Sequence, residues 1–316
     1  MKKVLKVIGK IILGIVAFIA ILLLGIFIFN RIKLADEKKM LAKQQTAQMV
    51  EVDGHRMGLY VSGEGEHTLV FMAGAGAPCP ILDYKGFVDR FDKDYKVVII
   101  EKFGYGFSDE YEGSRDVLTR VDQNRKALKE AGITGPYILC PHSYSGLETV
   151  FWAQNYPEEV EAIVGLDMAV PRAYDMYDEE VISSFKSVSS VNRALRELGI
   201  VRLFVGGTLP DEFSDEEKKL ATALVCRKYN SKTASNEADS IIADLKVIDG
   251  KPIPDIPTLL IISDGTVTDG WIDFEMDYAS KLSDVTTIQL DCGHSVYDHE
   301  PDKCEEAMRE FIEGLD

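Results

Sequence analysis

The sequence predicts an α/β fold with a mostly parallel central sheet, preceded by a membrane-spanning helix. Short apolar runs without polar alternation predict strands that are buried on both faces. Helical segments lie between these runs, which is typical of a parallel sheet covered by helices. A third observation is the stretch Ile11–Phe29, which has no charged or strongly polar residue. At 316 residues the chain is long enough for one large domain with appendages.

Ile11–Phe29 is the candidate membrane anchor. At about 1.5 Å rise per residue, its length matches the hydrocarbon core of a bilayer. It is longer than the apolar part of a cleaved signal peptide, and no A-x-A-like cleavage site follows it. We therefore expect an uncleaved signal anchor over residues 1–33 and a charged, helix-prone linker over 34–48.

Positive charge flanks both ends of the anchor. The N-terminal lysines favour a cytoplasmic N-terminus, so we expect the rest of the chain to be extracytoplasmic. Two features act against this orientation. Basic residues also follow the anchor, at Arg31, Lys33, Lys38 and Lys39. The five cysteines are scattered, without the spacing of a disulfide framework or a zinc site, and this fits an oxidising compartment poorly.

The net charge of −17 is unevenly distributed. Residues 1–43 carry nine Lys and Arg against two acidic residues, a net charge of +7, so the remainder carries −24. Such an acidic domain is not expected to bind nucleic acid, because the phosphate backbone would be repelled.

From residue 49 onward, strand-like and helical segments alternate. A hairpin is expected over 49–52 and 57–62, because Asp53-Gly54 favours a tight turn. The other predicted strands are 68–72, 95–101, 137–140, 160–166, 257–262 and 286–290. The predicted helices are 84–91, 120–131, 147–156, 272–282 and 301–315. Between 169 and 254 only helical periodicity is found, including a capping box at Ser214–Glu217, so we expect a helical cap inserted into a domain over 49–316.

A serine lies on the turn between the strand and the helix of residues 136–157. The sequence there is PHSYSG (141–146). A tight strand-to-helix turn exposes the serine hydroxyl above the sheet edge, at a helix N-terminus that favours negative charge. The common pattern G-x-S-x-G is replaced at its outer positions by Pro141 and Ser145. Ser143 is the candidate nucleophile, and the alternative is a serine that caps a buried helix.

Two further polar residues follow strand ends, Asp167 and His294. In parallel sheets the reactive groups lie at the carboxyl ends of the strands. A base is needed to take the serine proton, and a carboxylate is needed to orient that base. His294 remains after elimination of the other histidines. His55 is assigned to a hairpin turn, His67 to the start of a strand and His299 to the surface. The side chain of His142 is expected to point away from Ser143.

Together these segments resemble the α/β-hydrolase superfamily. The resemblance covers about Met49–Leu315. It is carried by MAGAGAP (72–78), EKFGYGFSD (101–109), PHSYSG (141–146), GLDMAVP (165–171) and DCGHSVYDHEP (291–301). The chain departs from the superfamily at Ala73-Gly74, where His-Gly is usual, at Glu101, where Asp is usual, and at the two outer positions of the serine turn.

The resemblance implies the α/β-hydrolase fold and a serine hydrolase of the carboxylesterase or lipase type. Ser143 would form an acyl intermediate with a small-molecule ester or amide, and His294 would act as the base. The backbone N–H groups of Ala75 and Tyr144 would form the oxyanion hole. A serine at this turn argues against the epoxide-hydrolase and dehalogenase branches, which need a carboxylate there. Neither a metal nor an organic cofactor is implied.

Three aspartates compete for the role of the triad acid. Many superfamily members carry it a few residues after the seventh strand, where Thr266 stands in this chain. Asp264 comes too early for that position and Asp269 somewhat late. A minority carry the acid at the end of the sixth strand, where Asp167 stands. We favour Asp167 and keep the other two as alternatives.

Two other functions are compatible with the sequence. One is an aminopeptidase resembling prolyl iminopeptidases, in which acidic cap residues would hold the substrate amine. The candidates for that role are Asp175, Asp178, Glu179 and Glu180. The other is a catalytically silent, membrane-tethered binding protein. For an esterase, an apolar pocket is suggested by the cap residues Tyr174, Met176, Tyr177 and Phe185.

Overall fold

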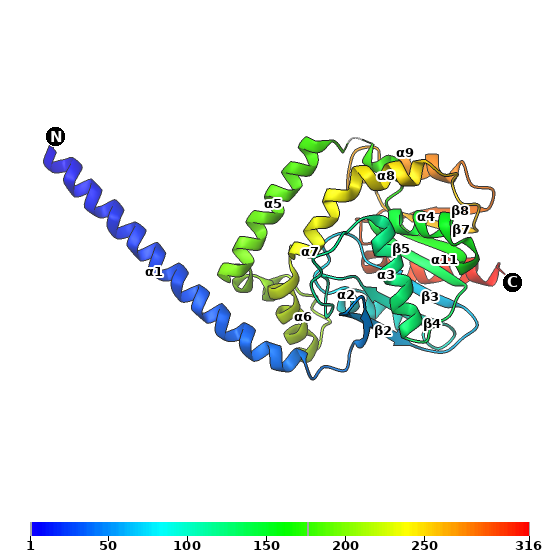
Figure 1. Ribbon diagram of the computed structural model, residues 1–316, viewed down its shortest axis with the longest axis horizontal. Helices are drawn as coiled ribbons and strands as arrows, with labels where there is room; N and C mark the ends of the chain where they lie inside the picture. Colours follow the sequence, from blue (N-terminus) through cyan, green and yellow to red (C-terminus); the bar gives the residue numbers. More distant parts are fainter. Residues whose placement is uncertain (1, 176, 316) are drawn as a thin grey trace.

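The computed structural model describes residues 2–175 and 177–315. A long N-terminal helix projects from a body that contains an eight-stranded sheet (Figure 1). Helices cover both faces of the sheet, and a further group of helices lies between the sheet and the N-terminal helix (Figure 1). Met176, one of the expected pocket residues, lies outside the described part of the chain.

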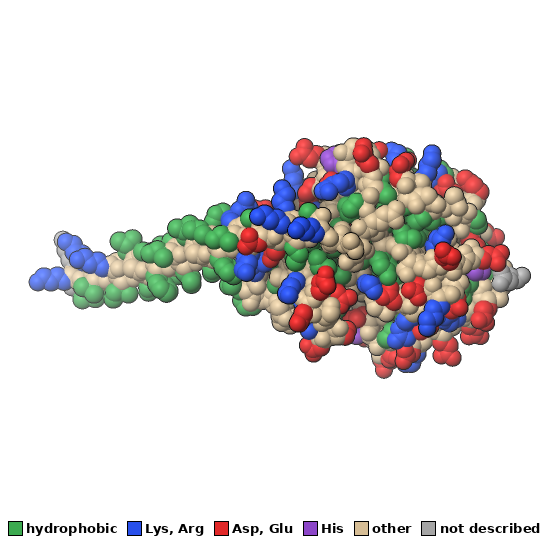
Figure 2. Space-filling model, turned by 90° about the horizontal axis from the view of Figure 1, so that it is seen from below, with side chains coloured by type: hydrophobic (Ala, Val, Ile, Leu, Met, Phe, Trp, Pro, Cys, Tyr) green, Lys and Arg blue, Asp and Glu red, His purple; other side chains and the backbone are tan. Residues whose placement is uncertain are grey.

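The N-terminal helix α1 (Lys2–Leu41) is continuous over 40 residues. It is long and apolar enough to cross a membrane, and its apolar side chains are exposed along the projecting rod (Figure 2). The structure differs from the linker expected over 34–48, because α1 continues to Leu41. The segment 34–41 is rich in strong helix formers, and Lys38 and Lys39 lie in the last turn, where positive charge is favourable.

The sheet has the strand order β1-β2-β4-β3-β5-β6-β7-β8. The pairs β1–β2 and β2–β4 are antiparallel, and all later pairs are parallel. This confirms the mostly parallel sheet. The strands are β1 (Gln48–Val52), β2 (His55–Ser62), β3 (Thr68–Met72), β4 (Lys96–Glu101), β5 (Tyr137–Ser143), β6 (Val160–Met168), β7 (Thr258–Ile262) and β8 (Val285–Gln289).

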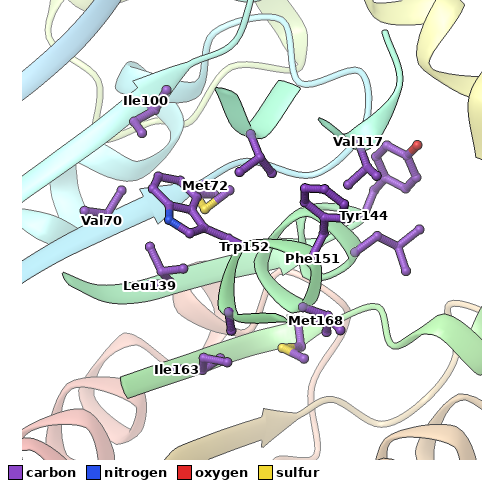
Figure 3. Packing of buried hydrophobic residues seen from close by; sticks show 14 of the residues in the cluster. Val70, Met72, Ile100, Val117, Leu139, Tyr144, Phe151, Trp152, Ile163 and Met168 are labelled. Atoms are coloured by element: carbon purple, nitrogen blue, oxygen red, sulfur yellow. The ribbon is translucent and has the colours of Figure 1, made fainter. Parts of the chain in front are cut away.

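Alternate residues of the strands enter two separate cores. Val70 and Met72 of β3 point to one side, where they meet Trp152, and Leu69 and Phe71 point to the other. Figure 3 shows the first core closing around the fully buried Trp152. This core is covered by α3 (Val117–Glu130), α4 (Ser145–Asn155), α8 (Ile241–Asp249) and α9 (Trp271–Ala279). The second core is covered by α2 (Pro80–Val88), α10 (Val296–His299) and α11 (Pro301–Glu313).

The chain between β6 and β7 is helical, as expected for a cap. Its other helices are α5 (Glu179–Leu198), α6 (Asp215–Lys228) and α7 (Lys232–Ser235), with short 3-10 segments between them. The predicted capping box is present at the start of α6: the Ser214 hydroxyl accepts from the Glu217 amide, and the Glu217 carboxylate accepts from the Ser214 amide.

Gly146 allows a close approach between α4 and the backbone that follows β6. A Cβ atom at this position of α4 would lie 2.1 Å from the carbonyl oxygen of Ala169, just after β6. The first turn of α4 therefore lies against the backbone that leaves the neighbouring strand, and a side chain would force the two apart.

The Gly146→Ala variant is expected to lower the free energy of unfolding by about 1–3 kcal/mol, because the added methyl overpacks this contact. Urea unfolding of the detergent-solubilised chain measures the change. The matched control is Gly86→Ala in α2, where an added Cβ has no neighbour within 4 Å. That control should raise the stability by up to about 1 kcal/mol, since alanine is the better helix former. Equal stability of wild type and Gly146→Ala would contradict the close-approach explanation.

Candidate active site

Ser143 lies on a strained turn at the carboxyl end of β5. Its φ angle is +53°, a left-handed conformation that costs a non-glycine residue about 1–3 kcal/mol. Two residues later α4 begins. The side chain lines a cavity of about 350 Å³, which is also lined by Ala75, His142 and His294. The turn thus presents the serine to a cavity, at the head of a helix.

The two unusual residues of this turn are accommodated by hydrogen bonding and by strand pairing. Ser145 is fully buried, and its hydroxyl lies 2.7 Å from the Met72 carbonyl oxygen and 2.8 Å from that of His142. The same hydroxyl accepts from the His142 amide at 3.0 Å. Pro141 pairs in register with Met72 in the β3–β5 ladder. Both departures from the common pattern are therefore compatible with a well-formed turn.

Asp167 is in direct contact with His294. Its Oδ2 lies 2.5 Å from the Nδ1 atom of His294. Its Oδ1 accepts from the Ser263 amide at 2.7 Å and from Trp271 Nε1 at 2.9 Å. The carboxylate is fully buried, so these bonds fix its position. With Nδ1–H donating to Asp167, the His294 Nε2 atom is an acceptor, as a general base requires.

The other two aspartates lie elsewhere. Asp264 accepts hydrogen bonds from the amide and the hydroxyl of Thr266, and so stabilises its own turn. Asp269 is exposed in the segment before α9. Of the three aspartates considered from the sequence, the structure brings Asp167 to His294.

His142 differs from the expectation that its ring points away from Ser143. The ring lines the same cavity, and its centroid lies 4.5 Å from that of His294. Strand alternation does not apply here, because the β5–β6 register shifts between His142 and Ser143. Burial, together with the neighbouring His294, lowers the pKa of His142 to about 3. The neutral ring can donate from Nε2 to the His294 carbonyl oxygen, 3.2 Å away.

The loop after β3 forms part of the wall of the cavity. Ala75 lines the cavity, and the next amide, that of Gly76, donates to the Tyr105 hydroxyl at 3.0 Å. Gly74 lies so close to the serine turn that a Cβ atom would be 2.8 Å from that of Ser143. Tyr144 follows the serine and is the residue before α4. Of the two residues expected at the oxyanion hole, Ala75 thus lines the same cavity as Ser143, and Tyr144 is its neighbour in the chain.

Glu101, the residue that replaces the usual Asp, stabilises the loop after β4. Its carboxylate accepts from the Phe107 amide at 2.6 Å and from the Ile81 amide at 3.2 Å. Complete burial raises the pKa of Glu101 to about 7. A Cβ atom at Gly106 would lie 1.9 Å from its Oε1. Glu101 therefore holds the loop after β4 against α2, and it does not line the cavity.

A buried network of charged residues connects the cap to the core beside Tyr144. Arg120 donates to the Glu148 carboxylate at 2.9 Å and to the Asp244 carboxylate at 3.2 Å. It also donates to the Tyr144 hydroxyl at 3.2 Å. Glu237 of the cap is paired with Lys102 and Arg115, and it accepts from the Tyr105 hydroxyl. Salt bridges from α3 and the β4 loop therefore hold the cap.

The sequence analysis missed this network. Its members are Lys102, Arg115, Arg120, Glu148, Glu237 and Asp244, and all are almost completely buried. They come from separate segments, and each residue alone would be interpreted as a solvent-exposed charge on a helix or loop. No local pattern marks them.

An aromatic pocket adjoins the Ser143 cavity. It has a volume of about 240 Å³ and is lined by Tyr144, Tyr174, Tyr177, Phe185 and the loop residues Ala75 and Gly76. The rings are in contact, with centroids 5.8 Å apart for Tyr144 and Tyr174 and 4.8 Å apart for Tyr174 and Tyr177. Within residues 2–175 and 177–315, no three His, Cys, Asp or Glu side chains are grouped to hold a metal ion.

Arg120→Met is expected to lower the free energy of unfolding by about 3–5 kcal/mol, because it leaves buried carboxylates without their partner. The matched control is Arg125→Met on the same helix, where Arg125 pairs with Glu159 at a partly exposed site. That substitution should cost about 1 kcal/mol or less. Chemical unfolding of both variants measures the difference, and equal losses would contradict the central role of Arg120.

Comparison with known proteins supports the fold. No protein-family model matches the chain. It is 29% identical over 325 residues to the uncharacterized protein YbdG of Bacillus subtilis, which covers 99% of both chains. The Cif epoxide hydrolase from Acinetobacter nosocomialis is similar in structure, with a TM-score of 0.70 at 16% identity, over 90% of this chain and 96% of that one. The epoxide hydrolase VrEH1 from Vigna radiata gives 0.68 at 16% identity, over 85% and 97%. The chain therefore has the α/β-hydrolase fold, as its motifs predict.

Proposed function

We propose that this protein is a membrane-anchored serine hydrolase that cleaves an ester through an acyl-Ser143 intermediate. The observation that carries the proposal is the hydrogen bond between the buried Asp167 and His294, whose ring lines the same cavity as Ser143. The serine lies on a strained strand-to-helix turn, the position that exposes a nucleophile in this fold. Helix α1 supports membrane anchoring by its length and composition. An extracytoplasmic position of the body remains part of the proposal.

In the proposed mechanism each residue has one role. Ser143 Oγ attacks the ester carbonyl while His294 Nε2 takes its proton. Asp167 holds the imidazole by its Nδ1–H and stabilises the imidazolium that forms. The amides of Ala75 and Tyr144 donate to the oxyanion, and each hydrogen bond stabilises the transition state by about 3 kcal/mol. His294 then returns the proton to the leaving alcohol, and a water molecule, activated by the same base, releases the acid.

The identity of the nucleophile favours an ester over an epoxide as the substrate. Two solved proteins with a similar fold are named as epoxide hydrolases. A carboxylate that opens an epoxide forms an ester, which water can hydrolyse. A serine that opened an epoxide would form an ether, which the same base and water could not cleave. Ser143 therefore favours acyl transfer over epoxide opening.

Among the residues that the structure describes, no contact favours the aminopeptidase alternative. Holding a substrate amine requires an unpaired carboxylate near the serine. Asp178 accepts from two amides at the start of α5, and Glu179 lines a separate, open groove. Glu237, the cap carboxylate at the aromatic pocket, is already paired with Lys102 and Arg115.

A fluorophosphonate probe is expected to label the wild-type protein and to lose labelling in Ser143→Ala, because the probe traps an activated serine. The matched control is Ser295→Ala, which removes another hydroxyl from the same cavity and should leave labelling in place. In-gel fluorescence with mass spectrometry identifies the labelled residue. A folded wild-type protein that takes no label would instead support a silent binding protein.

Asp167→Asn is expected to slow both labelling and ester turnover by about 10³–10⁴-fold, because the amide would favour the wrong tautomer of His294. The matched controls are Asp264→Asn and Asp269→Asn, which should keep nearly wild-type rates. Rates are measured with a short p-nitrophenyl ester. A large loss in either control, with Asp167→Asn active, would assign the acid differently.

A further inference from the structure

The end of α1 is docked on the cap. Asn30 is completely buried, and its Nδ2 atom donates to the carbonyl oxygens of Arg196 and Glu197 at the end of α5, at 3.3 and 3.4 Å. Its Oδ1 atom accepts from Arg202 Nε at 2.8 Å. A Cβ atom at Gly199, the residue that ends α5, would lie 2.5 Å from that of Asn30. The backbones are therefore in close contact.

A second set of contacts, further along α1, holds the same arrangement of α1 and the cap. Arg202 forms two hydrogen bonds with the Glu37 carboxylate, at 2.5 and 2.9 Å. The Arg227 guanidinium of α6 donates to the carbonyl oxygen of Leu34. Both Arg202 and Glu37 are largely buried. The last part of α1 is thus held by charged and polar contacts to two cap helices.

These contacts set the height of the cap relative to a membrane. The apolar run of α1 ends at Phe29, and the docked Asn30 follows directly. If α1 spans the bilayer, the end of α5 lies at the bilayer surface. Arg31 and Lys33 are exposed at this level, where lipid headgroups favour positive charge. Figure 2 shows Lys and Arg side chains gathered where the rod meets the body.

Helix α5 carries an exposed apolar stripe on this side of the molecule. The cap stripe consists of Phe185, Val188, Val191 and Leu198, continued by Leu203 and Phe204. Val191 is 60% exposed and Phe204 is 67% exposed. The spacing places the α5 members on one flank of the helix. The other flank carries Ser183, Lys186 and Ser190, which line an open groove. Figure 1 shows α5 on the side of the body that faces α1, with its end at that helix.

We propose that the cap stripe rests in the surface of the bilayer that α1 crosses, so that the enzyme takes its ester from the membrane. This inference rests on the proposed membrane anchor and serine hydrolase. Phe185 belongs both to the stripe and to the aromatic pocket beside Ala75 and Tyr144. The pocket therefore reaches the lipid-facing flank of α5. The substrate class that fits is an ester with an apolar chain, dissolved in the bilayer.

Depth-dependent quenching tests the placement directly. The full chain is reconstituted in lipid nanodiscs after Cys292→Ser, which removes the one partly exposed cysteine among the five. Single cysteines then replace Val188, Leu203, Ser190 or Ile19 and carry an environment-sensitive fluorophore. Spin-labelled lipids should quench the first two positions several-fold more than Ser190, the matched control on the polar flank of α5. Ile19, in the middle of α1, reports on the anchor itself.

The outcomes separate the two proposals. Strong quenching at Ile19, Val188 and Leu203 supports the inference. Quenching at Ile19 alone overturns it while leaving the anchor in place, and a concentration-dependent dimer in that case would assign the stripe to a second copy of the chain. An unquenched Ile19 overturns the anchor and the inference together. Fluorophosphonate labelling of each preparation shows separately whether the serine hydrolase proposal holds.

Activity provides the second measurement. The double variant Val188→Asp/Val191→Asp should turn over a bilayer-dissolved long-chain ester at least several-fold more slowly, and a short soluble ester at the wild-type rate. The matched control is Ser187→Asp/Ser190→Asp, which adds the same charge to α5 outside the stripe. Equal turnover of the long-chain ester by wild type and both variants would overturn the inference. Since all four side chains are exposed, folding is expected to be unaffected.

Discussion

The backbone at Ser143 is the constraint on which the site depends. A left-handed serine at the end of β5 persists only where the surrounding chain allows no other conformation. Gly74 allows the loop after β3 to lie within van der Waals distance of this turn, and Gly146 does the same for the end of β6. The same close approach places Asp167, itself left-handed and fully buried, where it can bond to His294. The backbone strain of Ser143 and Asp167 is thus balanced by the packing of three strand ends.

Much of this arrangement could be predicted from the sequence. The bounds of strand β3 and of the β1–β2 hairpin were predicted closely. Their apolar runs are bounded by glycines, which favour the turns at which these strands end. The order of Ser143, Asp167 and His294 could be read from the strand ends. The length of α1 and the position of the His142 ring could not. The first depends on contacts with the cap as well as on local helix formers, and the second depends on a register shift that no residue pattern reveals.

The buried network was hidden for a different reason. A charged residue on a helix usually faces water, so the sequence gives Arg120 and Glu148 no special weight. Their burial results from the cap, which brings Glu237 and Asp244 over the core. Each charge of the network has at least one opposite charge within 3.5 Å, which offsets the cost of removing it from water. These salt bridges therefore hold the cap in place beside Tyr144.

The continuity of α1 has a mechanical consequence. A linker between a membrane anchor and a soluble body would let the two tilt independently. Here one unbroken helix runs from the apolar segment to Leu41, and its last turns are bonded to α5 and α6. If α1 spans a membrane as proposed, a change in helix tilt, such as a thicker or thinner bilayer imposes, would rotate the cap with it. The aromatic pocket would turn by the same angle, so membrane thickness would act on the orientation of the substrate entrance.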